Sequence, residues 1–222
     1  MKRGRLIVIE GTDGSGKSTQ FARLCRRAEH EGIAFQRLVF PQYQEESSAL
    51  LRMYLNGEFG RKPGDVNAYA ASSFYAVDRY ASFLRFWRKD YLSGATIVAD
   101  RYTTSNAVYQ MEKTPPEDWN KYLAWLQDYE YGKLQLPRPD LVLFLDMPTE
   151  ISQRLLSGRY AGDERKKDLH ESNVEFLTRC RRTALYAAEA MGWHTVSCSQ
   201  EGAPRKIEDI QRDIREIVSQ KL

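Results

Sequence analysis

The sequence predicts an α/β fold of three layers, in which helices flank a mostly parallel sheet of five strands. Short apolar runs alternate along the chain with amphipathic segments of helical period, the pattern of consecutive strand–helix units. The first run, residues 6–9, is apolar without alternation, which is typical of a parallel strand covered on both faces. No repeat and no linker rich in Pro, Gly or Ser divides the chain, so we expect one domain over residues 1–222.

Each predicted element has its own pattern. A glycine-rich turn follows the first strand, and apolar residues then recur at helical spacing between residues 21 and 28, up to Gly32. Further short apolar runs predict strands at 35–40, 95–99, 141–145 and 194–198. Longer periodic segments predict helices at about 66–91, 117–131, 149–157, 177–191 and 207–217. Because ligands of such sheets bind beyond the carboxyl ends of the strands, we expect the functional residues there.

The composition favours a soluble protein that does not bind nucleic acid. Lys and Arg number 33 and Asp and Glu number 30, so the chain lacks the basic excess that nucleic-acid binders usually carry. No stretch approaches the roughly 20 apolar residues of a membrane-spanning helix, and the apolar run near the N-terminus is too short for a signal sequence. The three cysteines show no metal-binding spacing, which favours reduced thiols. We therefore expect a cytoplasmic protein with no nucleic-acid and no membrane partner.

A phosphate-binding loop follows the first strand. The motif GxxxxGK[ST] is formed by Gly11, Thr12, Asp13, Gly14, Ser15, Gly16, Lys17, Ser18 and Thr19. Glycines let backbone N–H groups close around phosphate oxygens, and the helix that starts near Lys17 adds the positive end of its dipole. Lys17 is expected at the β- and γ-phosphates of ATP, and Ser18 at magnesium. The strand before the loop and the helix after it are the context that the motif requires, so the fold is predicted to be that of a P-loop NTPase.

The P-loop alone does not separate kinases from other nucleotide-binding proteins. A GTPase would need an N-K-x-D sequence to read guanine, and the only Asn-Lys pair, Asn120-Lys121, continues as Tyr122-Leu123. A GTPase is therefore disfavoured.

A second charged motif, Asp100-Arg101-Tyr102, directly follows the predicted strand at 95–99. Both charged side chains then emerge at the carboxyl end of a strand, beside the P-loop. One interpretation is a surface ion pair, which would contribute little to stability. The interpretation we favour is that Arg101 binds a phosphate in a bidentate manner, while Asp100 orients the magnesium shell or the arginine.

Several motifs together resemble those of thymidylate kinases, a family of P-loop nucleoside monophosphate kinases. The most specific match is the segment 100–110, DRYTTSNAVYQ, with its Asp-Arg-Tyr start and Tyr-Gln end. The other matches are Asp13 in the P-loop, Phe40-Pro41-Gln42-Tyr43, Tyr75-Ala76-Val77-Asp78-Arg79, Leu145-Asp146-Met147-Pro148 and a basic segment near 159–167. The resemblance runs from about residue 5 to residue 190, which is nearly the whole chain.

The resemblance implies a set of substrate contacts. Tyr75 takes the position of a ring that stacks on thymine, where phenylalanine is usual, and Arg79 that of an arginine that hydrogen-bonds the base. Asn106 resembles a contact to the base edge, and Tyr109 a ring that excludes a ribose 2′-hydroxyl. The remaining implied substrate positions are Asp13, Phe40, Tyr43, Arg101 and Ser105.

Some of these positions are open to a second interpretation. The aromatic residues 40, 43 and 75 are also compatible with ordinary core packing. Asp13 either meets the sugar 3′-hydroxyl and, through water, magnesium, or it caps the P-loop helix. We favour the substrate role, because Gly14-Ser15-Gly16 separates Asp13 from the start of the helix.

A basic segment at about 158–168 is interpreted as a lid. Such charged runs are usually solvated loops, but phosphoryl transfer needs cations around the moving group and the exclusion of water. Some thymidylate kinases carry a catalytic arginine in the variable part of the P-loop and others carry it in the lid. Because Gly14 occupies the P-loop position here, Arg159 and Arg165 are the candidates, and the sequence does not choose between them.

The predicted reaction transfers the γ-phosphoryl group of ATP to dTMP and gives dTDP and ADP, with Mg²⁺ as cofactor. The predicted catalytic residues are Lys17, Arg101, Asp13 and a lid arginine, and the predicted metal ligands are Ser18 and Asp100. Two alternatives stay open: a P-loop kinase of another pyrimidine nucleotide or deoxynucleoside, and a nucleotide-binding module without turnover. The resemblance also implies a homodimer, for which the apolar helix at 66–91 would supply the interface.

Overall fold

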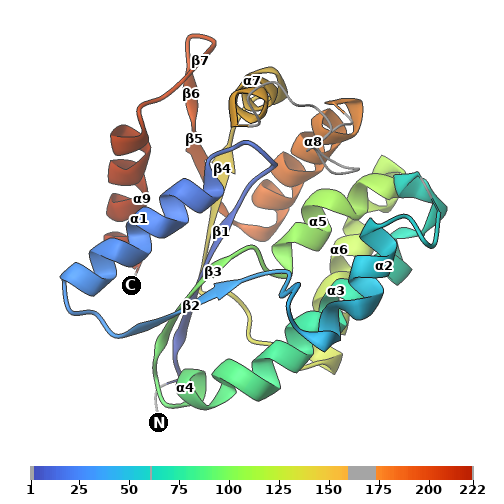
Figure 1. The fold of residues 1–222 in the computed structure, drawn as a ribbon, viewed down its shortest axis with the longest axis horizontal. Coiled ribbons are helices and arrows are strands. Elements are labelled where there is room, and N and C mark those ends of the chain that lie inside the picture. The colour runs from blue at the N-terminus through green and yellow to red at the C-terminus, as the bar shows by residue number, and fades with distance from the viewer. Residues whose placement is uncertain (1–2, 61, 160–173, 222) are drawn as a thin grey trace.

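The computed structural model describes residues 3–60, 62–159 and 174–221, and it confirms the predicted fold class (Figure 1). Five parallel strands form one sheet in the order β2-β3-β1-β4-β5. Their bounds are β1 (Arg5–Glu10), β2 (Phe35–Val39), β3 (Thr96–Asp100), β4 (Leu141–Asp146) and β5 (His194–Ser197). Each predicted strand is therefore present, and its ends differ from the prediction by no more than about one residue.

The strands are apolar without alternation because each one contributes side chains to two cores. In β1, Leu6 and Val8 belong to the larger core, whereas Ile7 and Ile9 belong to the smaller core on the other face of the sheet. The larger core receives side chains from α5 (Thr104–Tyr109), α6 (Trp119–Gln127) and α8 (Val174–Met191), and also from the helical segment at 68–91. The smaller core is covered by α1 (Lys17–His30) and α9 (Ile207–Lys221). Two helical layers thus enclose the sheet, as Figure 1 shows.

The long helix predicted at 66–91 is interrupted. It consists of α3 (Ala68–Ser82), a π-helical segment (Phe83–Trp87) and α4 (Arg88–Leu92). Asn67 caps the start of α3, where its side chain accepts a hydrogen bond from the backbone N–H of Ala70 (2.9 Å). The remaining elements are α2 (Ala49–Leu55), α7 (Thr149–Arg159) and a hairpin of β6 (Ser199–Gln200) and β7 (Ala203–Pro204). The sequence did not indicate α2 or α5, since helices of seven and six residues are too short to display a period.

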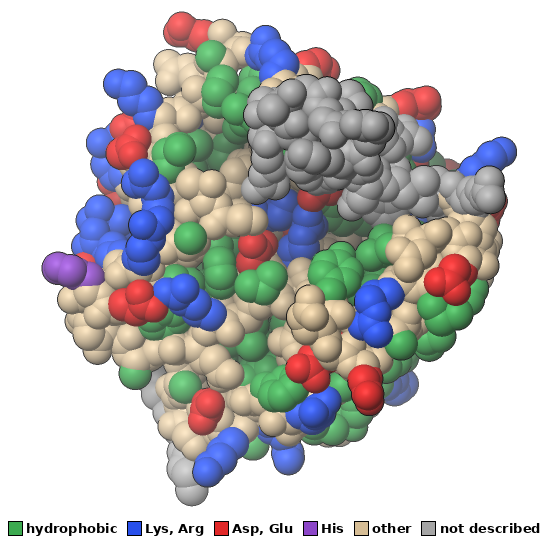
Figure 2. All heavy atoms as spheres, viewed as in Figure 1, with side chains coloured by type: hydrophobic (Ala, Val, Ile, Leu, Met, Phe, Trp, Pro, Cys, Tyr) green, Lys and Arg blue, Asp and Glu red, His purple; other side chains and the backbone are tan. Residues whose placement is uncertain are grey.

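The predicted lid falls mostly outside the described residues. Arg165 lies in the gap at 160–173, and Arg159 ends α7 with its side chain also outside what the structure describes. Within the described ranges, no helix is long and apolar enough to cross a membrane. On the face drawn in Figure 2, basic and acidic side chains intermix, in keeping with a formal charge of +3.

Candidate active site

The register of the sheet brings the two predicted motifs together. Ile9 pairs with Asp100, so the P-loop after β1 and the Asp-Arg motif at the end of β3 leave the same edge of the sheet. The backbone N–H of Arg101 donates to the Ile9 carbonyl oxygen (3.0 Å), and Arg101 itself adopts a left-handed conformation (φ 66°). Such a backbone conformation costs a non-glycine residue of the order of 1 kcal/mol, and functional sites are where it concentrates.

The P-loop turns tightly into the N-terminus of α1. Gly14 (φ 79°) and Gly16 (φ 90°) both have left-handed backbones, and a Cβ at Gly14 would lie 2.6 Å from the Ser152 carbonyl oxygen. Glycine is therefore required at both positions. The Ser15 hydroxyl is buried and has no hydrogen-bond partner among the described residues. A buried polar atom without a partner, inside a loop of N–H groups, fits an anionic ligand.

Lys17 lies inside this loop. Its ammonium donates to the Thr12 carbonyl oxygen (2.9 Å) and lies 3.7 Å from the Asp13 carboxylate. Burial, and secondly the nearby Arg101, lowers the pKa of Lys17, whereas the surrounding carboxylates raise it. An added anion such as a phosphate would favour the charged ammonium further, because opposite charges nearby stabilise the charged form.

Arg101 faces the P-loop across the site. Its guanidinium forms an ion pair with Asp13, and Nη1 lies 3.8 Å from the Glu10 carboxylate. The guanidinium lies 5.1 Å from the centre of the Tyr109 ring, and the Tyr109 hydroxyl donates to the other Asp13 oxygen (3.0 Å). Burial disfavours the charged guanidinium, but Tyr109, Asp13 and Glu10 outweigh it and raise the pKa of Arg101. Arg101 is thus a permanent cation held against the P-loop.

Glu10 is a site residue that the sequence reasoning missed. It ends β1 and is fully buried, and its carboxylate accepts from the backbone N–H of Gly11 (2.9 Å). The same carboxylate accepts from the hydroxyls of Thr104 and Ser105 in the first turn of α5, both at 2.7 Å. Glu10 therefore connects the P-loop, Arg101 and α5. An acidic residue directly between an apolar strand and a glycine was the available signal.

One cavity brings together nearly all the predicted substrate residues. Its lining contains Asp13, Phe40, Tyr43, Tyr75, Arg101, Ser105, Asn106 and Tyr109, together with Pro41, Leu55 and Gln110. Of the predicted substrate residues, all of which the structure describes, only Arg79 is not part of this lining. The lining mixes aromatic rings with a few charged and amide groups, which is typical of a small-molecule site.

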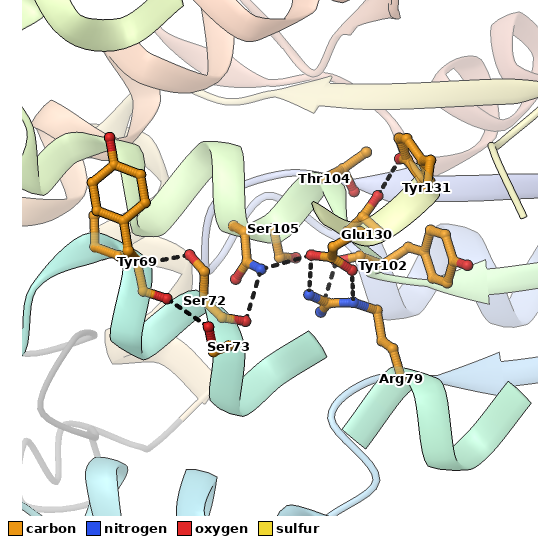
Figure 3. Close-up of polar contacts among 12 residues, drawn as sticks. Tyr69, Ser72, Ser73, Arg79, Tyr102, Thr104, Ser105, Glu130 and Tyr131 are labelled. Atoms are coloured by element: carbon orange, nitrogen blue, oxygen red, sulfur yellow. Dashed lines mark hydrogen bonds and ion pairs between the residues drawn. The ribbon is translucent and has the colours of Figure 1, made fainter. Parts of the chain in front are cut away.

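Arg79 lies buried behind that lining. Its Nε and Nη2 donate to the two carboxylate oxygens of Glu130 (2.8 and 2.6 Å), as Figure 3 shows. Nη1 also reaches the Tyr102 carbonyl oxygen at a longer 3.4 Å. Glu130 lies in a π-helical segment (Asp128–Lys133) after α6. No local sequence pattern predicted its pairing with Arg79 of α3. A direct contact between Arg79 and a base therefore stays a prediction.

Asp78 ties α3 to the segment that follows β2. Its buried carboxylate accepts from the backbone N–H of Gln42 (2.9 Å) and from the Ser47 hydroxyl (2.8 Å). The peptide bond before Pro41 is cis, and the Phe40 ring packs 5.8 Å from the ring of Tyr102. The segment that carries Phe40 and Tyr43 is thereby held at the mouth of the substrate cavity.

A second cavity surrounds the P-loop and shares Asp13, Phe40 and Arg101 with the first. It extends to an apolar end that the sequence did not indicate, formed by Met147, Leu155, Leu156, Pro204, Ile207 and Ile210, with Arg205 beside them. Apart from Met147, which belongs to the Leu145–Pro148 match, these residues carry no motif, and they come from distant parts of the chain. Two adjoining cavities that meet at Arg101 and the P-loop suit two ligands whose phosphates meet there.

The residues predicted to hold magnesium are neighbours. The Ser18 hydroxyl donates to Oδ2 of the buried Asp100 (3.3 Å). Among the described residues, no group of three or more His, Cys, Asp or Glu side chains could hold a metal ion without other ligands. Magnesium suits this arrangement, because it commonly takes one or two protein oxygens and completes its shell with phosphate oxygens and water.

Fold and site together define a P-loop phosphotransferase. A sequence model described as "Thymidylate kinase" matches residues 9–214. The thymidylate kinase of Mycobacterium tuberculosis is 32% identical over 85% of this chain and 87% of its own. The human thymidylate kinase is 30% identical over 96% of this chain and 89% of its own. A solved structure of thymidylate kinase from Candida albicans, 24% identical, has the same fold, with a TM-score of 0.71 over 98% of this chain and 92% of that one.

The chain belongs to the thymidylate kinase family, and it is an ATP-dependent phosphotransferase that converts dTMP to dTDP.

Proposed function

We propose that Lys17, Arg101 and a lid arginine carry out direct, in-line transfer of the γ-phosphoryl group from ATP to the 5′-phosphate of dTMP. The observation that carries this proposal is the position of Arg101, on the wall shared by the substrate cavity and the P-loop cavity. A guanidinium there binds the acceptor phosphate and meets the γ-phosphoryl group as it is transferred. The lid cation is Arg159 or Arg165, as the family resemblance implies.

The reaction needs no strong general base. The acceptor phosphate is ionised at neutral pH, so catalysis consists of positioning and charge neutralisation. Arg101 and Lys17 both form ion pairs with Asp13. When dTMP binds, its phosphate takes over the contact to Arg101, and Asp13 becomes available to the sugar 3′-hydroxyl.

Ser18 and Asp100 would hold magnesium beside the phosphates. When bound, the ion neutralises the charge of the β- and γ-phosphate oxygens. Asp100 also remains close enough to accept from Ser18, so the two side chains hold each other in position.

The remaining cavity residues hold the nucleoside. Tyr75 stacks on the base, Asn106 meets its edge, and Tyr109 limits the space at the ribose 2′-position. The bond from the Tyr109 hydroxyl to Asp13 supports this last role, because it fixes the ring beside the sugar site. Arg79, whose guanidinium lies behind the lining, hydrogen-bonds the base, as the family resemblance implies.

The active species is a homodimer that forms through α3. Val77, Tyr80 and Leu84 recur at helical spacing on the outer side of α3 and the π-helical segment, and all three are exposed. A contiguous exposed apolar stripe of this kind is typical of a protein–protein interface.

The experiment that tests the mechanism is the substitution Arg101→Ala. Turnover of dTMP should fall about 100- to 1000-fold, the usual effect of removing a group that stabilises transition-state charge, while the Kd for ATP stays nearly unchanged. Arg37→Ala, which removes an exposed arginine paired with Glu29, is the matched control and should retain full activity. Unchanged turnover in Arg101→Ala would remove this residue from the mechanism.

An acceptor panel checks this reaction against the alternatives that the sequence leaves open. With Mg²⁺ and ATP, the protein should prefer dTMP over UMP and thymidine in kcat/KM. A strong preference for thymidine would indicate a deoxynucleoside kinase, and the absence of ADP with every acceptor would indicate a binding module.

A further inference from the structure

The substrate cavity has a buried carboxylate directly behind it. Glu130 is fully buried in the π-helical segment after α6 and receives both Nε and Nη2 of Arg79 (Figure 3). π-Helical segments inside helices are frequent at functional sites. Because one oxygen of this carboxylate also touches a residue of the cavity lining, Glu130 is the natural candidate for a further role in recognition.

That lining residue is Asn106. Its Nδ2 donates to Oε1 of Glu130 (2.9 Å) and to the Ser72 carbonyl oxygen (3.3 Å). A carboxylate oxygen and a carbonyl oxygen only accept hydrogen bonds, so the NH₂ side of the amide must face both of them. The flipped amide would place its oxygen against two oxygens inside a buried site, which is strongly unfavourable.

The orientation of the amide decides what Asn106 can recognise. With both hydrogens of Nδ2 used, the group that Asn106 offers to a ligand in the cavity is its oxygen, a pure acceptor. A thymine ring carries a donor at N3–H between two carbonyl groups, whereas N3 of cytosine is an acceptor. An acceptor oxygen therefore complements thymine and repels cytosine.

We propose that Glu130 is a positioning residue that sets the base selectivity of the enzyme by fixing the Asn106 amide with its oxygen toward the base. The inference rests on the proposal that dTMP binds in this cavity with Asn106 at the base edge. Arg79 contributes by holding the carboxylate in place through two parallel hydrogen bonds, with 2% of its own side chain exposed. Arg79 and Glu130 form one unit that orients the Asn106 amide.

A carboxylate is needed at position 130, because a glutamine can donate. In Glu130→Gln, the side-chain oxygen at the Oε2 position still accepts from Nε of Arg79, whereas the NH₂ at the Oε1 position faces Asn106 and no longer accepts from Nη2. The Asn106 oxygen then has a donor inside the protein, and its own NH₂ can turn toward the base. Only the Ser72 carbonyl oxygen still opposes this turn.

The test is the ratio of kcat/KM for dTMP to kcat/KM for dCMP in the wild type and in Glu130→Gln. We expect the ratio to fall at least about tenfold, the effect of gaining or losing one hydrogen bond at a buried site. A purely structural role would lower both values together and leave the ratio unchanged. An unchanged ratio in a folded Glu130→Gln protein overturns the proposal.

Glu130→Asp keeps the proposal testable if Glu130→Gln does not fold. It retains the negative charge beside Arg79 but withdraws the carboxylate from Asn106, so the ratio should again fall, by a smaller factor. The matched control is Glu112→Gln, which removes another largely buried carboxylate that is paired with an arginine, Arg179, away from the base site. Its ratio should equal that of the wild type.

The proposed function and the role of Glu130 can be disproved separately. If the wild type does not phosphorylate dTMP, the proposed function fails. If the wild type prefers dTMP but neither Glu130 variant changes the ratio, only the role of Glu130 fails.

Discussion

The charged side chains at the centre of the site are paired rather than isolated. Arg79 pairs with Glu130, and Arg101 and Lys17 both lie against Asp13. Such buried or half-buried pairs add little net stability, because desolvation offsets their attraction, but removing one partner leaves a costly unpaired charge. We infer that these pairs serve to orient side chains rather than to stabilise the fold. Each one holds a donor or an acceptor in the direction that a phosphate or a base requires.

A half-buried lysine outside the catalytic set gives a pH-dependent prediction. Lys113 donates to the Tyr54 hydroxyl (2.8 Å) and to the Val66 carbonyl oxygen (3.1 Å), and burial lowers its pKa from 10.5 to about 8. Between pH 8 and 10.5, the unfolded chain therefore still binds a proton that the folded protein has released. Since stability rises with pH wherever the unfolded state binds more protons, the burial cost of Lys113 is present below pH 8 and is relieved above it.

The measurement is urea denaturation of the wild type and of Lys113→Met at pH 7 and pH 9.5. The free energy of unfolding of the wild type, relative to the variant, should rise by about 2 kcal/mol between these pH values. Lys133→Met is the control. It removes a lysine that forms an exposed ion pair with Asp128, and so it shows how the loss of a surface lysine changes the free energy of unfolding. A relative stability that falls with pH would contradict the assignment.

Among the elements, those fixed by local chemistry were predictable. The five strands follow from continuous apolar runs, and the P-loop follows from a motif whose glycines the backbone needs at Gly14 and Gly16. The two short helices α2 and α5 carry no period, so only the packed structure reveals them.

Within the site, too, the sequence predicted what a local motif encodes and missed what depends on distant contacts. The gathering of Asp13, Tyr75 and Tyr109 around one cavity agrees with the family motifs, although their roles stay predictions. Glu130 was missed because it pairs with Arg79 across a long sequence separation that no local pattern encodes. The apolar end of the P-loop cavity was missed for the same reason. Glu10 was missed although its place between an apolar strand and a glycine was a local signal, and only its contacts to α5 are distant in sequence.

A contact between α3 and the segment after β2 holds the mouth of the substrate cavity in place. Asp78 of α3 is the acceptor for the backbone N–H of Gln42 and for the Ser47 hydroxyl. Asp78→Ala leaves these donors unsatisfied, which should cost about 1–3 kcal/mol of stability. It should also raise the KM for dTMP several-fold, since the segment with Phe40 and Tyr43 loses its anchor, while the Kd for ATP stays constant.

Steady-state kinetics and ATP titration distinguish this effect from general destabilisation. Asp65→Ala is the control, because its carboxylate also accepts a backbone N–H, that of Lys62, but in an exposed turn. Equal losses of ATP and dTMP affinity in Asp78→Ala would refute a local anchoring role.

At the scale of the whole molecule, the proposed dimer interface lies on the same helix as the base site. The outer side of α3 exposes Val77, with Leu84 in the π-helical segment that follows, whereas Tyr75 lines the substrate cavity and Arg79 is buried behind it. A partner subunit packed on the outer side would therefore restrain the helix that positions the base. Dimer formation and substrate affinity are expected to be coupled.

The substitution Leu84→Glu tests this coupling, because it places a charge at one end of the apolar stripe without touching the cavity. Light scattering after size exclusion should give the mass of one 25.7 kDa chain for the variant and twice that mass for the wild type. The KM for dTMP should rise in the monomer as α3 loses its restraint, with ATP affinity preserved. Leu185→Glu, at a comparably exposed leucine on α8, should remain dimeric. A wild type that is monomeric at micromolar concentration would show that there is no such interface. A dimeric Leu84→Glu would place the interface elsewhere. Either result would also remove the proposed coupling.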